Sequence, residues 1–219
     1  MVNVRRFDVL SAVAATGDAR GPADGRRRRQ ALDLARERGL GRAACVFDVV
    51  ALDAAENGVL RLRGESLHAP RLIPKTGQLT ALAFGACTLG AAISEHVAAL
   101  FAERRAALAL ALDALGNAMV MEASRRVQDL TLALVRKRGL TMAGELRPGD
   151  PGLALEAQPL VLRLSGAERI GIDCTQGLNL SPHKSASVVY GVGRDLPATT
   201  WSRCDDCRWR ESCRARGDR

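Results

Sequence analysis

Three cysteines lie close together near the end of this 219-residue chain, with spacing that suits a metal site. Cys204 and Cys207 are separated by two residues, and Cys213 follows after five more. A Cys-x2-Cys turn brings two sulfurs to one side, where they can hold zinc or the edge of an iron–sulfur cluster. A fourth ligand could come from Cys174, Cys87 or a histidine. The alternatives are redox-active thiols and cysteines that bind nothing.

Two charged side chains are candidates for ligand binding or for internal pairing. Lys184 lies beside Ser185 in a polar loop and close to Tyr190, the only tyrosine of the chain. It can bind an anionic group or face water. Asp113 precedes Asn117 by four residues in an apolar stretch, so both occupy one helix face. Because a buried carboxylate is costly without a partner, Asp113 either pairs inside the protein or lines a pocket.

Arg147 opens an Arg-Pro-Gly turn that ends at Gly149. A guanidinium at such a turn can bind a ligand carboxylate through two parallel hydrogen bonds, or it can face water. The sequence has no glycine-rich phosphate loop, no serine elbow and no paired-carboxylate motif. Hydrolase and nucleotide-kinase functions are therefore disfavoured.

The composition limits the classes of protein and partner. Apolar residues make up 47% and charged residues 26%, which is typical of a soluble globular protein. We find no apolar run long enough to span a membrane and no export signal, so we expect a cytoplasmic protein without a membrane partner and with cysteines outside disulfides. The formal charge is +8, but basic runs such as 26–29 lack interleaved aromatics, which argues against nucleic acid as a partner.

Apolar spacing and turn residues predict the elements that position these side chains. We expect helices over 4–15, 91–103, 105–138 and 155–164, strands over 78–89, 169–173 and 186–192, and a hairpin joining 43–54 to 59–63 across Glu56-Asn57-Gly58.

The long helix is apolar round almost its whole circumference between residues 106 and 121, which predicts that it is buried at the centre. The fold class is α+β, with one mixed or antiparallel sheet and flanking helices. We expect one domain over 1–198 and a short cysteine-rich tail over 199–219.

Several motifs together resemble a known family. They are Phe84-Gly85-Ala86-Cys87-Thr88-Leu89-Gly90, Leu112-Asp113-Ala114-Leu115-Gly116-Asn117-Ala118, Leu155-Glu156-Ala157-Gln158 and Ser181-Pro182-His183-Lys184-Ser185-Ala186-Ser187. With the cysteine tail, they resemble small stand-alone relatives of the activation domain of vitamin B12-dependent methionine synthase. The resemblance runs across essentially the whole chain, and the CTLG and PHKSAS segments are its most specific parts.

This resemblance implies a helmet-shaped α+β domain that binds S-adenosylmethionine. It implies that Tyr190 lies near the ligand, that Arg147-Pro148-Gly149 forms the ligand loop, and that a helix acid, which falls at Met121 or Glu122, meets the methionine amino group. The candidate cofactor-binding residues are Asp113, Glu122, Arg147, Gly149, Lys184, Ser185 and Tyr190. The candidate metal ligands are Cys204, Cys207 and Cys213.

The resemblance predicts an accessory protein that supports reductive methylation of cob(II)alamin. Cobalamin would be carried by a partner, a corrinoid-binding protein or methyltransferase, because the Asp-x-His-x-x-Gly motif of cobalamin domains is absent here. A reductant protein, or an iron–sulfur cluster at the cysteine tail, would supply the electron. The alternative is a non-catalytic binding protein, stabilised by zinc or an iron–sulfur cluster, with a basic interaction surface.

Overall fold

The computed structural model describes residues 2–16 and 22–197, with the side chains of 22–24 left out. The strands in this part of the chain are β1 (Asn3–Asp8), β2 (Arg42–Ala51), β3 (Ala54–Glu56), β4 (Val59–Leu62), β5 (Glu65–His68), β6 (Gln78–Thr88), β7 (Thr141–Leu146), β8 (Asp173–Cys174), β9 (Leu180–Ser181) and β10 (Ser185–Arg194). The helices are α1 (Leu10–Ala15), α2 (Pro22–Glu37), α3 (Ala92–Ala102), α4 (Ala106–Arg136) and α5 (Gln158–Ser165), with short 3-10 turns at Pro70–Leu72, Leu155–Ala157 and Ala167–Ile170.

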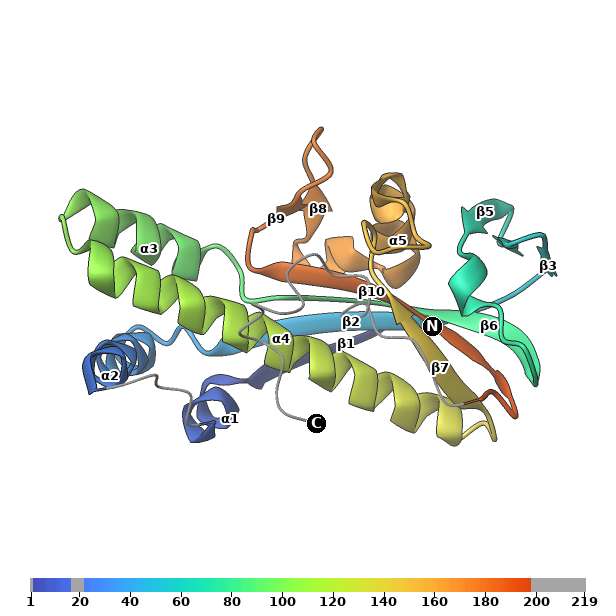
Figure 1. Ribbon diagram of the computed structural model, residues 1–219, viewed down its shortest axis with the longest axis horizontal. Helices are drawn as coiled ribbons and strands as arrows, with labels where there is room; N and C mark the ends of the chain where they lie inside the picture. Colours follow the sequence, from blue (N-terminus) through green and yellow to red (C-terminus); the bar gives the residue numbers. More distant parts are fainter. Residues whose placement is uncertain (1, 17–21, 198–219) are drawn as a thin grey trace.

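A five-stranded antiparallel sheet forms the centre of the protein. Its strand order is β1-β2-β6-β10-β7, so β10, the last strand in the described part of the chain, lies between β6 and β7. Helices α1 to α4 cover one face, and α5 with the small strands covers the other (Figure 1). The α+β fold class is confirmed, and its sheet is antiparallel.

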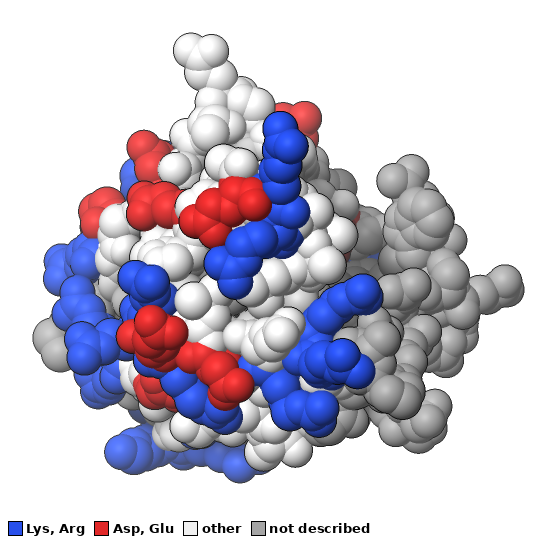
Figure 2. Space-filling model, turned by 90° about the vertical axis from the view of Figure 1, so that its left-hand side faces the viewer, with Lys and Arg blue, Asp and Glu red and all other residues white. Residues whose placement is uncertain are grey.

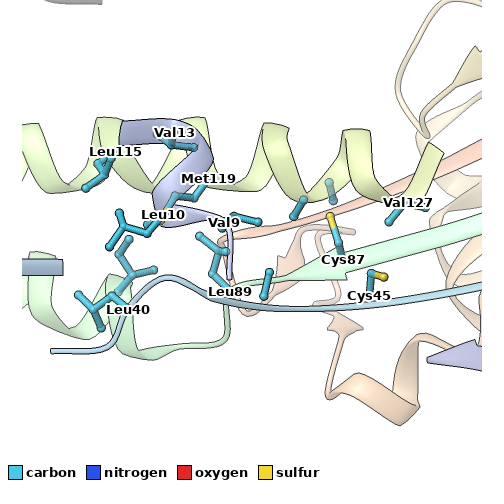
Figure 3. Close-up of a cluster of buried hydrophobic side chains, with 14 of the residues drawn as sticks. Val9, Leu10, Val13, Leu40, Cys45, Cys87, Leu89, Leu115, Met119 and Val127 are labelled. Atoms are coloured by element: carbon cyan, nitrogen blue, oxygen red, sulfur yellow. The ribbon is translucent and has the colours of Figure 1, made fainter. Parts of the chain in front are cut away.

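The main core lies between the sheet and α4. Figure 3 shows Leu115, Met119 and Val127 of α4 over Leu89, Cys87 and Cys45 of the sheet side. The buried positions of α4 recur at helical spacing, which places them on one face of the helix. The packing of α4 therefore fixes its orientation on the sheet.

In the described part of the chain the opposite face of α4 is exposed, so the prediction that α4 is buried at the centre is wrong for that face. Leu110 is 62% exposed, and only 33% of the most apolar 18-residue window of α4 is buried. α4 is long and apolar enough to cross a membrane, but its buried face packs on the sheet as a core helix does.

The N-terminal segment is half strand and half helix, where the sequence predicted one helix over 4–15. β1 pairs with β2 along its full length, and α1 begins only at Leu10. The Asp8 carboxylate accepts a hydrogen bond from the Leu10 amide at 2.9 Å, which starts the helix there. The predicted helix merged two elements because Phe7, Leu10 and Val13 have helical spacing by chance.

Two further predictions need correction. The Asn57-Gly58 turn joins β3 and β4, whereas the longer strand β2 pairs with β1 and β6. The strand predicted over 169–173 is mostly a 3-10 turn between Gly166 and Gly171, both with positive φ, and only Asp173 and Cys174 form a strand. The strands predicted over 78–89 and 186–192 and both long helices are confirmed.

Candidate functional site

One flank of α4 carries polar side chains that meet the loop before β10. The Lys184 ammonium lies 2.7 Å from Asp113 Oδ1 and donates to Asn117 Oδ1 at 2.6 Å. The backbone oxygen of Asp113 lies 3.4 Å from the same nitrogen. Lys184 is 9% exposed, so it does not face water. These contacts fix the loop before β10 against the first half of α4.

Asp113 is paired, as one of the two alternatives predicted, but it is not buried. Its side chain is 44% exposed, whereas that of Lys184 is 10% exposed. The two partners therefore differ in solvation. The lysine is the member that depends on the pair, because a buried ammonium is costly without an acceptor.

Ser185 connects the same loop to the end of β6. Its hydroxyl donates to Thr88 Oγ1 at 2.8 Å, and the Gly90 amide donates to that oxygen at 3.0 Å. The CTLG and PHKSAS segments therefore meet in space through these side chains.

Further along α4, Arg147 lies between the helix and the edge strand β7. Its Nη2 donates to Ser124 Oγ at 2.8 Å and lies 3.2 Å from Glu145 Oε1. Its Nε also approaches Glu145 Oε1, at 3.3 Å. The side chains of Arg147 and Glu145 are 18% and 32% exposed. A cation and an anion thus lie side by side where the sheet ends.

The turn after Arg147 is held by its own backbone. The Arg147 amide donates to Asp150 Oδ2 at 2.8 Å, and the Gly149 amide donates to the Leu153 carbonyl at 2.9 Å. Gly149 has φ +93°, which side chains with a Cβ rarely adopt. The sequence-predicted turn at Arg147-Pro148-Gly149 therefore exists and places the arginine over α4.

Tyr190 lies deeper, in the core between β10 and α4, and is 1% exposed. Cys45 of β2 and Cys87 of β6 are directly paired across the sheet, and both are free thiols. Burial raises the pKa of Cys45 to about 11 and that of Cys87 to about 12. The positive charge of Arg147 acts in the opposite direction on the pKa of Cys87, but the effect of burial is larger.

Glu122 does not join these residues. It lies nine positions after Asp113 on α4, about two and a half helical turns, so it points to the opposite flank. Its carboxylate is 3.3 Å from Arg125 and 3.7 Å from Arg126 on the same helix. Met121 is apolar, so neither position supplies a carboxylate on the flank of Arg147.

Sequence reasoning missed Ser124 and Glu145. Glu145 and Arg147 alternate about Leu146 in β7, and this alternation could have placed both on one face. Ser124 had no sequence signal of its own, because only the packing of α4 on β7 brings it to Arg147.

Two surface hollows formed by the described residues lie elsewhere. One of about 580 Å³ lies between α2 and the start of α4, and the other, of about 310 Å³, lies between α1 and the end of α2. Neither contains a predicted site residue.

The predicted metal ligands Cys204, Cys207 and Cys213 lie outside the described residues. Within residues 2–16 and 22–197, no three His, Cys, Asp or Glu side chains are grouped so that they could hold a metal ion.

Comparisons with known proteins identify the fold. No protein-family model matches the chain, and no curated protein matches its sequence. Among solved structures, the chain is similar to the MetH reactivation domain bound to AdoHcy, with a TM-score of 0.63 and 14% sequence identity. The match covers 93% of this chain and 81% of the other.

The chain therefore has the fold of the MetH reactivation domain, as the sequence motifs predicted. At 14% sequence identity, the match shows the fold of the chain but not its ligand or its partner.

Proposed function

We propose that this protein is an S-adenosylmethionine-linked accessory protein that reactivates a cobalamin-dependent methyltransferase. The observation that carries the proposal is the fold, which is shared over nearly the whole chain with a domain that binds AdoHcy. AdoHcy and S-adenosylmethionine share the adenosine and the amino-acid part, so a site that binds one can accept the other. Residues 1–198 would form this domain, in the cytoplasm, and residues 199–219 would form a separate tail.

The charge pair at the end of the sheet supports an amino-acid ligand. A ligand α-carboxylate would replace Glu145 on Arg147, and the released Glu145 carboxylate would then be placed to accept a hydrogen bond from the α-ammonium group. We propose Glu145 for the role that the resemblance gave to Glu122, since Glu122 lies on the opposite flank of α4. Gly149 and Tyr190 would shape the rest of the site.

Asp113, Lys184 and Ser185 would act by holding the loop before β10 in place. The ammonium of Lys184 already contacts Asp113 and Asn117, so an anionic ligand would have to displace these acceptors. Asp113, Lys184 and Ser185 would therefore hold the loop beside the ligand site in place and would not contact the ligand.

The chemistry would come from the bound groups. S-adenosylmethionine would supply a methyl group to cobalamin on a partner methyltransferase, and a reductant protein would supply the electron. This chain would bind and orient the methyl donor against the partner.

A direct binding measurement tests the proposal. Calorimetric titration with AdoHcy should give saturable binding to the full chain, and Arg147→Ala should weaken it at least ~10-fold by removing the carboxylate contact. Arg163→Ala is the matched control, because Arg163 forms an exposed ion pair with Glu65 away from this site. Wild-type protein that binds neither AdoHcy nor S-adenosylmethionine would contradict the proposal.

We further propose that Cys204, Cys207 and Cys213 hold an iron–sulfur cluster, which would give the protein its own electron donor. The support is their spacing. Protein purified without oxygen should contain iron and acid-labile sulfide and absorb in the visible range, and Cys204→Ala should lose both. Zinc in place of iron would point to a structural role for the tail.

A further inference from the structure

Ser124 is a buried residue of α4 whose side chain bonds to a residue outside the helix. It is 5% exposed, and its Oγ accepts a hydrogen bond from Arg147 Nη2 at 2.8 Å. A serine or threonine inside a helix often donates instead to the carbonyl oxygen four residues earlier. Thr131, the other buried hydroxyl residue of α4, does this, with Val127 O as the acceptor at 2.7 Å. The hydroxyl of Ser124 therefore connects α4 to the turn after β7.

The guanidinium of Arg147 divides its hydrogen bonds between two partners. Nη2 carries two N–H groups, and it donates to Ser124 Oγ and, at 3.2 Å, to Glu145 Oε1. Nε donates to the same Glu145 oxygen at 3.3 Å. One carboxylate oxygen thus occupies the side of the guanidinium formed by Nε and Nη2. A carboxylate that turns both oxygens to that side can form two parallel hydrogen bonds with it.

These contacts give Glu145 and Ser124 different relations to an incoming carboxylate. The two bonds from Arg147 to Glu145 are longer than the about 2.7–2.9 Å of a charge-assisted pair, and the Glu145 side chain is 32% exposed. A ligand carboxylate can therefore replace it. Ser124 is buried and bonds to the same Nη2, which has a second N–H group for the ligand. The hydroxyl can thus stay bonded to Arg147 during the exchange.

Arg105, at the start of α4, is held less firmly. Its side chain is 57% exposed and pairs at 3.1 Å with that of Glu103, which is 56% exposed. Figure 2 shows acidic and basic side chains interspersed with uncharged surface at this end of the molecule, which α2, α3 and the start of α4 form. The hollow of about 580 Å³ here is lined by Arg105 and also by Asp33 and Glu37. Because exposed ion pairs fix side chains only weakly, this hollow does not orient a guanidinium as Ser124 does.

We propose that Ser124 is a positioning residue for the carboxylate of the ligand. Through Nη2 it holds the guanidinium of Arg147 in the orientation in which Nε and Nη2 face the ligand carboxylate once Glu145 has been replaced. This inference rests on the proposed function, because it requires AdoHcy or S-adenosylmethionine at Arg147. It predicts that the hydroxyl matters only for ligands that carry the amino-acid group.

Calorimetric titration of the full chain with two ligands tests the proposal. Ser124→Ala should weaken AdoHcy binding about fivefold and leave the binding of 5′-methylthioadenosine, which lacks the amino-acid group, unchanged. Ser124→Thr keeps the hydroxyl and should bind AdoHcy within about twofold of the wild type. Thr131→Val is the matched control, because it removes the other buried hydroxyl of α4 and should change neither affinity. Circular dichroism at the titration temperature shows that each variant is folded.

A double variant separates a positioning role from a packing role. Because Ser124 would act through the guanidinium, Ser124→Ala should weaken AdoHcy binding no further when Arg147→Ala is already present. Fully additive losses would overturn the inference, and so would an equal loss of affinity for AdoHcy and 5′-methylthioadenosine in Ser124→Ala.

The wild type and Arg147→Ala distinguish failure of this inference from failure of the proposed function. If the wild type binds AdoHcy, Arg147→Ala binds it weakly and Ser124→Ala binds it as the wild type does, the inference is wrong and the proposed function stands. If the wild type binds neither AdoHcy nor S-adenosylmethionine, both are wrong.

Discussion

Lys184 and Arg147 lie along the same flank of α4, but their surroundings differ. Lys184 is nearly buried, and its ammonium meets three oxygens of Asp113 and Asn117. Arg147 contacts one hydroxyl and one carboxylate at the edge of the sheet, next to a turn. The Lys184 cluster is held together by its own internal contacts, whereas Arg147 and Glu145 place a positive and a negative group near the surface. We therefore propose that Lys184 holds the fold and that Arg147 binds the ligand.

The largest effect that this comparison predicts is on stability. Lys184→Ala should lower the free energy of unfolding by about 2 kcal/mol, because it removes a nearly buried ion pair whose acid partner is still partly solvated. Urea denaturation followed by circular dichroism measures the change. Lys75→Ala is the control, since Lys75 is exposed and should have almost no effect.

Lys184→Ala also tests whether Lys184 holds the loop in place or contacts the ligand. If Lys184 acts only through position, Lys184→Ala measured well below its melting temperature should bind AdoHcy within about twofold of the wild type. A loss of AdoHcy binding as large as that of Arg147→Ala, with the fold intact, would show that Lys184 contacts the ligand and would remove the contrast.

A smaller effect is expected at Glu145. Glu145→Gln keeps the shape of the side chain but removes its charge, so AdoHcy should bind about fivefold more weakly, equivalent to about 1 kcal/mol. Binding of 5′-methylthioadenosine, which lacks the amino-acid group, should not change. An equal loss for both ligands would assign Glu145 to the packing of Arg147 and not to the ligand.

The sequence predicted correctly those elements whose form depends on residues close together in the chain. The apolar spacing of α4 and the glycine after β6 are local signals that gave the correct element, and the Asn57-Gly58 turn gave a hairpin, although its first strand is β3 and not β2. The prediction was wrong where two elements share one spacing, as in β1 and α1. α4 is buried on one side alone. This depends on how many layers of secondary structure pack against it, which the residues of α4 do not specify.

The site was predictable in part for the same reason. Arg147 and the turn at Gly149 follow from a short motif. The pairing of Lys184 with Asp113 joins residues 71 positions apart in sequence, so it needs α4 and the start of β10 to pack together. Glu145 was missed because its proposed role depends on its contact with Arg147 at the end of β7, which the sequence motif did not show.

The position of β10 has a consequence for synthesis of the protein. β10 is the last strand of the five-stranded sheet in sequence, yet it supplies the partner of both β6 and β7. Until residue 194 has left the ribosome, β6 has an unpaired edge and β7 has no neighbour in the sheet. The nascent chain therefore holds an incomplete sheet for most of its translation, and a chain cut short before β10 would expose two strands that are prone to aggregate.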